Sequence, residues 1–195
     1  MKLAVPSASG TAMMQPRRTE AGGSRVVHVM QGGYEASALP GDMFTTILGS
    51  CVCTCLCDPE AGIGGINHFL LPDTGGSTSR QLHYGLHSME LLINALLKLG
   101  ASKDRLQAKL FGGAMMNNRL GGIGRANAEF AQRFLENEAI TCVSKSLGGT
   151  LARRIRYWPT SGRAQQLFLR ADTPALIEQR AKPILKGASD DVTFF

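Results

Sequence analysis

The sequence lacks any apolar run approaching the roughly 20 residues that a membrane-spanning helix requires. Of its 195 residues, 44% are hydrophobic and 18% are charged, a globular composition that predicts a protein not inserted in a membrane. A secretory signal is also missing, because Lys2 is followed by only the apolar residues Leu3-Ala4-Val5 before Pro6. These two absences predict a cytoplasmic protein.

The sequence also lacks a basic stripe interleaved with aromatic residues, the pattern typical of nucleic-acid binding. Its formal net charge is +6 and its pI is near 9.3, but the basic residues are scattered, with short clusters at Arg17-Arg18 and at 153–156. Gly112-Gly113 is not followed by the Lys-Ser or Lys-Thr of a phosphate-binding loop. We therefore expect no nucleic-acid partner, and a mildly basic surface that suits an acidic protein.

Five cysteines are present, but their spacing fits neither a zinc site nor a disulfide framework. Cys51, Cys53, Cys55 and Cys57 alternate along one extended segment. Extended residues two apart are separated by roughly 6.6 Å, so these thiols span about 20 Å and cannot converge on one ion. Alternation on one strand is also unlike the disulfide pattern of small secreted domains. The spacing therefore predicts no zinc site at these four thiols, and Cys142 is expected to be a buried apolar thiol.

The order of predicted elements favours an α+β fold, a single-domain α/β sandwich with largely antiparallel sheets and packed helices. Residues 1–24 are rich in Ser, Gly, Ala and Pro and predict a disordered leader, residues 25–170 predict one domain, and residues 171–195 predict a C-terminal helix and tail. Gly100 is placed to end the first helix. Strands are predicted at 25–30, 51–57, 62–71, 106–111, 140–145, 153–158 and 165–169, and helices at 83–99, 125–137 and 174–185.

The segment 45–72 is predicted to contain a β-hairpin whose turn opens at Asp58. If the next two residues form the tip, the numbers of facing residues sum to 119 and Cys51 faces His68. Directly opposed residues have Cβ atoms roughly 4.5 to 5.5 Å apart, which suits a thiol and an imidazole that must touch. A three-residue loop with a glycine bulge would instead shift the sum to 120 and place Phe69 opposite Cys51.

A cysteine-dependent hydrolase needs a thiolate, a base, a group that orients the base and donors for the oxyanion. Gly49-Ser50 leads into Cys51, and the amides of Ser50 and Cys51 are candidate oxyanion donors. A neighbouring imidazolium lowers a thiol pKa from about 8.5 to roughly 3.5 to 7.5, so His68 would activate Cys51. Thr45 or Thr46 could orient the second ring nitrogen. The alternative is a buried strand thiol beside a core histidine, and spacing alone does not choose between them.

These residues also carry a resemblance to a known family. Leu48-Gly49-Ser50-Cys51-Val52, with Asp58-Pro59, Gly64-Gly65, His68 and Leu71-Pro72, resembles the core motif of CheD-type chemoreceptor glutamine deamidases. Further similar segments lie at 84–100, 111–114, 123–127, 148–150 and 153–155, so the resemblance covers about residues 25–170. The chain departs from the family pattern at Ser146, where an acidic residue is common, and at Ala152, where glycine is common.

The resemblance implies that residues 25–170 form a deamidase domain with Cys51 as nucleophile, His68 as base and Thr45 as the orienting group. It implies a fold related to deamidating toxins such as cytotoxic necrotizing factor. The implied activity is that of a protein-glutamine glutaminase, which converts glutamine side chains of methyl-accepting chemotaxis receptors to glutamate without a cofactor.

Two other functions are left open at this stage. The resemblance also implies that such a protein can act as a non-catalytic binding module that regulates a CheC-type chemotaxis phosphatase. The alternating cysteines leave a third alternative, a redox or metal-binding thiol protein.

Overall fold

The structure is a computed structural model that describes residues 25–71, 78–115 and 121–169, without the side chains of 78–81 and 121. The predicted leader over 1–24 lies outside the described residues. The predicted helix over 174–185 and the C-terminal tail lie outside them as well.

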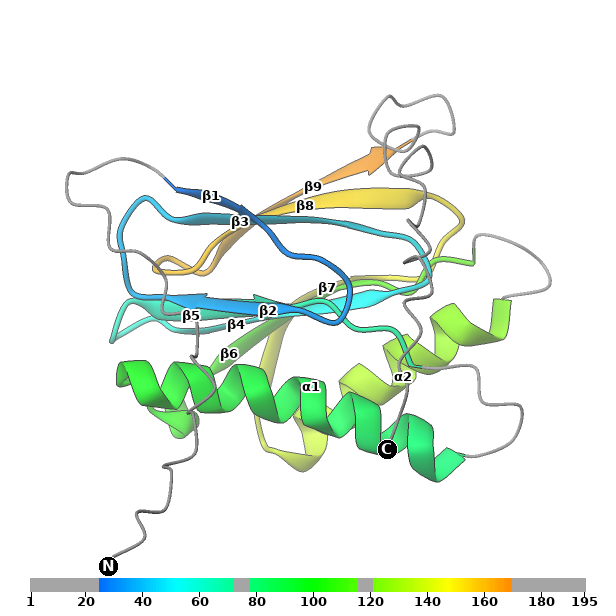
Figure 1. Ribbon diagram of the computed structural model, residues 1–195, viewed down its shortest axis with the longest axis horizontal. Helices are drawn as coiled ribbons and strands as arrows, with labels where there is room; N and C mark the ends of the chain where they lie inside the picture. Colours follow the sequence, from blue (N-terminus) through cyan, green and yellow to red (C-terminus); the bar gives the residue numbers. More distant parts are fainter. Residues whose placement is uncertain (1–24, 72–77, 116–120, 170–195) are drawn as a thin grey trace, which may run out of the picture.

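Figure 1 shows three layers, in which two sheets stack face to face and two helices cover the far side of the second sheet. The four-stranded sheet has the order β1 (Val26–His28), β3 (Met43–Leu48), β8 (Ala152–Trp158), β9 (Arg163–Leu169). The five-stranded sheet has the order β2 (Tyr34–Ser37), β5 (Ile63–Asn67), β4 (Val52–Asp58), β6 (Gln107–Gly112), β7 (Thr141–Leu147). The helices are α1 (Thr78–Leu99), α2 (Gly121–Asn137) and the short 3-10 turn η1 (Lys103–Arg105).

Strand pairing in the described ranges is antiparallel except between β1 and β3 and between β6 and β7. The mixed α+β class with largely antiparallel sheets is therefore confirmed. The link to the toxin fold stays a prediction.

Strand β4 is buried on both faces because it lies in the middle layer. Val52 and Leu56 pack in the core under the helices, whereas Cys53 and Cys55 pack in the core between the two sheets. A strand covered on both sides is read in sequence as a continuous apolar run. The alternating thiols of Cys53, Cys55 and Cys57 are buried, so they contribute packing volume to the fold.

The helices are found where periodicity places them, but each begins earlier than predicted. Helix α1 begins at Thr78 and α2 at Gly121, and α1 ends as expected at Gly100, whose amide donates to Leu97 O at 3.0 Å. Strands β2 and β3 are absent from the predicted elements. The expectation for Cys142 is wrong, since its side chain is exposed on β7, at the uncovered edge of the five-stranded sheet.

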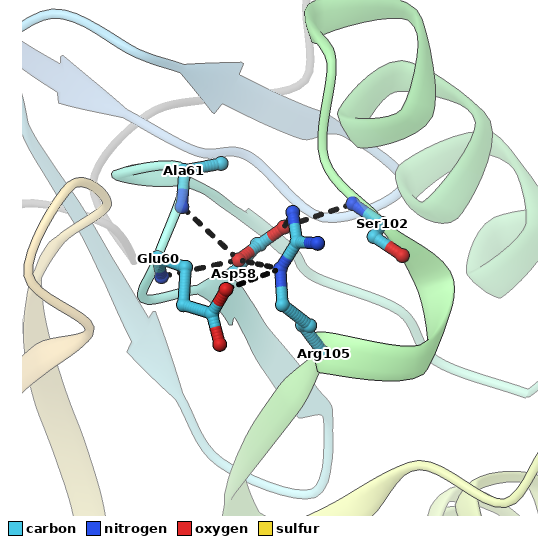
Figure 2. A network of polar contacts seen from close by, with 5 residues as sticks. All are labelled: Asp58, Glu60, Ala61, Ser102 and Arg105. Atoms are coloured by element: carbon cyan, nitrogen blue, oxygen red, sulfur yellow. Dashed lines mark hydrogen bonds and ion pairs between the residues drawn. The ribbon is translucent and has the colours of Figure 1, made fainter.

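The turn between β4 and β5 contains four residues because the Asp58 carboxylate folds over it (Figure 2). Asp58 Oδ1 accepts hydrogen bonds from the amides of Glu60 and Ala61, both at 3.1 Å. From the other side, Asp58 Oδ2 accepts from Arg105 Nη2 at 2.6 Å and from the Ser102 amide at 2.8 Å. The bond from Arg105 is the main reason why the pKa of the Asp58 carboxyl lies well below its usual value.

This longer turn changes the hairpin register. The bridge between Val52 and Phe69 and all the β4–β5 pairs join residues whose numbers sum to 121. Both predicted sums, 119 and 120, are therefore wrong, and Cys51 faces neither of the residues expected opposite it. The observed register continues to Cys53 opposite His68, with Cys51 on the diagonal of the same face, at a separation of roughly 7 to 8 Å.

Candidate active site

The loop Gly49-Ser50-Cys51 joins the two sheets, running from β3 to β4, and each of its carbonyls is held by a different group. Gly49 O accepts from the Ala114 amide at 2.8 Å, and Cys51 O accepts from the Gly113 amide at 2.7 Å. Ser50 O accepts from Asn127 Nδ2 at 3.1 Å. All three carbonyls are thus bonded to groups outside the loop, and the backbone amide of Cys51 partly offsets the rise in its thiol pKa that burial causes.

Asn127 on α2 forms hydrogen bonds both with this loop and with the segment that follows His68. Its side chain is completely buried, and besides Ser50 O it bonds Leu71, whose amide donates to Asn127 Oδ1 at 2.7 Å. The Asn127 carboxamide thus links the backbone next to Cys51 with the backbone shortly after His68. Its role was not predicted from the sequence, although a polar residue on the buried face of an amphipathic helix is a usable signal, because such a group requires partners.

The imidazole of His68 is buried between the sheets, with 5% of the residue exposed. Thr46 Oγ1 donates its single hydrogen to Val29 O at 2.8 Å, so it accepts from His68 Nδ1, also at 2.8 Å. The network therefore assigns the proton to Nδ1 and leaves the lone pair on Nε2. Nε2 is buried and has no hydrogen-bond partner among the described residues, and burial lowers the His68 pKa. This histidine is a neutral base with one free nitrogen.

The orienting threonine differs from the one that the resemblance implies. Thr45 lies opposite Arg156, an exposed residue of the outer face of the four-stranded sheet, and its Oγ1 donates to Ile155 O at 2.8 Å. Adjacent strand residues point to opposite faces, so Thr46 points inward and contacts His68. In this structure Thr46, and not Thr45, contacts the His68 ring, and an orienting role for Thr45 stays a prediction.

The thiol of Cys51 is half-buried and donates to Gln31 Oε1 at 3.3 Å. Burial raises the Cys51 pKa to about 11, so the sulfur is protonated at neutral pH in this arrangement. A neutral thiol therefore lies beside a neutral imidazole, on one face of the hairpin. Catalytic hydrogen bonds often form only when substrate is bound, and a catalytic dyad of Cys51 and His68 stays a prediction at this point. Gln31 directly follows the strand predicted at 25–30, and its position gave no local signal of chemistry.

The family departure at Ser146 lies beside a buried arginine. Arg153 is 1% exposed, and its Nη1 donates to Ser146 O at 2.6 Å and to Ser146 Oγ at 3.2 Å. No carboxylate pairs with Arg153 within the described ranges, and burial lowers its pKa. The position at which the resemblance led us to expect an acid thus offers Arg153 neutral acceptors, near the end of β7.

Comparison with known proteins identifies the family. The family model described as CheD chemotactic sensory transduction matches residues 70–166. A protein of Cereibacter sphaeroides is 56% identical over 170 residues, which cover 87% of this chain and 85% of the relative. This chain belongs to the CheD family. A CheD relative from Agrobacterium fabrum is 50% identical over 173 residues, covering 87% of this chain and 96% of the relative, and both relatives are named "Probable chemoreceptor glutamine deamidase CheD".

The predicted resemblance to CheD proteins is therefore confirmed. The matched range of the family model begins after Cys51 and His68, so it carries no information on the dyad. Among solved structures, a Neisseria meningitidis protein described by the family model DUF152 superimposes with a TM-score of 0.42 and 12% identity, covering 65% of this chain and 64% of that one. Because the TM-score is this low, we draw no conclusion about fold or function from this structural similarity.

Residues 25–71, 78–115 and 121–169 also bear on membrane insertion and on metal binding. No helix there is long and apolar enough to cross a membrane. In the same part of the chain, no three His, Cys, Asp or Glu side chains are grouped so that they could hold a metal ion.

Proposed function

We propose that this chain deamidates glutamine side chains of methyl-accepting chemotaxis receptors, with Cys51 as nucleophile and His68 as base. The CheD relatives supply the substrate class through their names. The observation that carries the proposal is the state of His68, whose Nδ1 proton is fixed by Thr46 while its buried Nε2 stays free on the face that Cys51 shares. A buried nitrogen without a partner is costly in a purely structural histidine, and it is required in a general base.

The proposed reaction begins when the Cys51 thiol turns from Gln31 to His68 and transfers its proton to Nε2. The sulfur then bonds the carbon of the substrate carboxamide, and the C=O electron pair moves onto the oxygen. As the C–N bond breaks, His68 gives its proton to the leaving nitrogen and ammonia departs. Water, deprotonated by His68, attacks the thioester, which releases the glutamate carboxyl and returns the thiol.

The oxyanion requires donors next to the sulfur. The amides of Ser50 and Cys51 lie in the loop that carries the sulfur. We propose that these amides stabilise the adduct, with Gly49 giving the loop its tight approach. A relation to the fold of deamidating toxins and a cytoplasmic location belong to this proposal too. Regulation of a CheC-type phosphatase stays a prediction, and no contact of the described residues favours it over catalysis.

Mass spectrometry of receptor cytoplasmic domains tests the proposal, because converting an amide to an acid adds about one dalton per site. We expect the gain with the wild-type protein and none with Cys51→Ala. The matched control is Cys142→Ala, which removes an exposed thiol from β7. Receptor deamidation by Cys51→Ala at the wild-type rate, or its loss in Cys142→Ala, would show that the nucleophile lies elsewhere.

A further inference from the structure

Gln31 is held beside the dyad by a rigid turn. The Gly33 amide donates to Met30 O at 2.9 Å, and Gly32 has φ +84°, the value that the third residue of a type II turn requires. The same turn is fastened to His68, whose carbonyl accepts from the Gly32 amide at 2.7 Å and whose amide donates to Gly33 O at 3.0 Å. The backbone of Gln31 is therefore fixed relative to His68.

The side chain of Gln31 makes one hydrogen bond in the described structure, and that bond is with the nucleophile. Gln31 Oε1 accepts from Cys51 Sγ at 3.3 Å, while the residue itself is exposed. The carboxamide thus lies next to the sulfur on a solvent-exposed residue. It is near enough to Cys51 to contact a substrate carboxamide bound at the sulfur.

The contact is not the geometry of an attack on Gln31. A hydrogen bond to a carbonyl oxygen lies near the plane of the amide, along a lone pair. A nucleophile must instead approach the carbonyl carbon from above that plane. The contact that is present joins the Cys51 sulfur to Oε1 at 3.3 Å, and the sulfur donates in it, so it is a hydrogen bond to the oxygen that a neighbouring group can keep through many turnovers.

We propose that Gln31 is a catalytic residue that donates from Nε2 to the developing oxyanion of the substrate carboxamide. This inference rests on the proposed deamidase function. When the Cys51 thiol turns to His68, Gln31 Oε1 loses its donor, and rotation about the broad terminal torsion exchanges Oε1 for Nε2. The Cys51 amide and Gln31 Nε2 then approach the oxygen from two different segments of the chain.

The expected loss of kcat on replacing Gln31 depends on how far its side chain is exposed to water. Removing one oxyanion donor from an enclosed site lowers kcat by about 100-fold to 1000-fold. Gln31 is exposed, so water replaces part of its contribution, and we expect a loss of about 10-fold to 100-fold for Gln31→Ala. The KM should change by no more than about twofold, because the donor acts on the transition state. Gln31→Glu should be worse, since its carboxylate repels the oxyanion.

The experiment measures kcat and KM for receptor deamidation in wild type, Gln31→Ala and Gln31→Glu. The control is Gln107→Glu, which makes the same change at an exposed position at the start of β6. A second measurement, the pH dependence of Cys51 alkylation by iodoacetamide, needs no substrate. Gln31→Glu should raise the pH at which the thiol reacts, and Gln107→Glu should leave it unchanged.

The outcomes separate this inference from the proposed function. If wild type deamidates receptors and Gln31→Ala keeps kcat within twofold, Gln31 is not an oxyanion donor. A gain of about one dalton at Gln31 in wild type, absent in Cys51→Ala, would make Gln31 a substrate and also overturn the inference. If wild type itself releases no ammonia, the proposed function fails, and the inference that rests on it fails as well. An alkylation profile shifted by Gln31→Glu would then confirm only the contact between Gln31 and Cys51.

Discussion

Replacing Asn127 with alanine should destabilise the fold by about 2 kcal/mol. The substitution leaves the Leu71 amide and the Ser50 carbonyl without their partner, and an unpaired buried polar group costs about 1 to 3 kcal/mol. Leu71 is buried, so its amide carries the full penalty, whereas half-buried Ser50 regains water in part. The bond from Asn127 to Ile123 O lies within α2, where that carbonyl keeps its helical partner. Alanine returns about 0.5 kcal/mol of helix propensity.

Urea unfolding followed by the fluorescence of Trp158, the single tryptophan, measures this difference. The matched control is Glu129→Ala on the same helix, which removes an exposed pair with Arg125 worth about 0.3 to 0.5 kcal/mol. An Asn127→Ala variant no less stable than the Glu129→Ala control, with an unchanged denaturant slope, would refute the reasoning. It would mean that the backbone around the dyad finds other partners.

Two further predictions follow from the site and the turn. Thr46→Val should lower kcat about 10-fold or more because it leaves the Nδ1 proton of His68 without its acceptor. Thr46→Ser keeps the hydroxyl and should retain most of the rate. A greater loss of kcat in Thr45→Val than in Thr46→Val would show that Thr45 orients His68. The lowered pKa of Asp58 means that its ionised form stabilises the fold above about pH 4, and that this contribution is lost as the pH falls further. Asp58→Asn should therefore lower the unfolding free energy at pH 7 by roughly 2 kcal/mol, less than for a fully buried ion pair because Arg105 is partly exposed. The unfolding free energy of this variant should also fall less than that of wild type between pH 5 and pH 3. Urea unfolding at each pH measures both effects.

The sequence predicted elements whose signal is local. The hairpin of β8 and β9 was found from its Pro-Thr-Ser-Gly turn, and α1 and α2 from their apolar period. The register of β4 against β5 was not found, because it depends on Arg105 and Ser102 closing on Asp58 from more than 40 positions away. Turn preferences depend only on residues that are neighbours in the sequence, so they do not predict such a contact.

The site shows the same division between local and distant causes. Cys51 and His68 were predicted as a dyad from a strand pairing that proved wrong, and the resemblance implied the same two residues independently. The choice between Thr45 and Thr46 depends on which face of the four-stranded sheet meets the second sheet, and neighbouring threonines give no sign of it. Gln31 reaches the site through a turn whose partner strand lies after β4, so nothing nearby in sequence marks it.

The pairing of β3 with β8 has a consequence for the order in which the protein becomes active. Thr45 and Ile155, which are joined across these strands, lie 110 positions apart. A ribosome adding 5 to 20 residues per second needs about 5 to 20 s to synthesise that interval. Once His68 has been added, the growing chain contains the thiol and the imidazole, but β3, which carries Thr46, is paired only with the short strand β1 until β8 is made. Long-range strand pairing is also the slow part of folding. We therefore expect deamidation to begin only after the β8–β9 hairpin has been synthesised and has paired with β3. The time at which activity appears during synthesis would measure when that pairing forms.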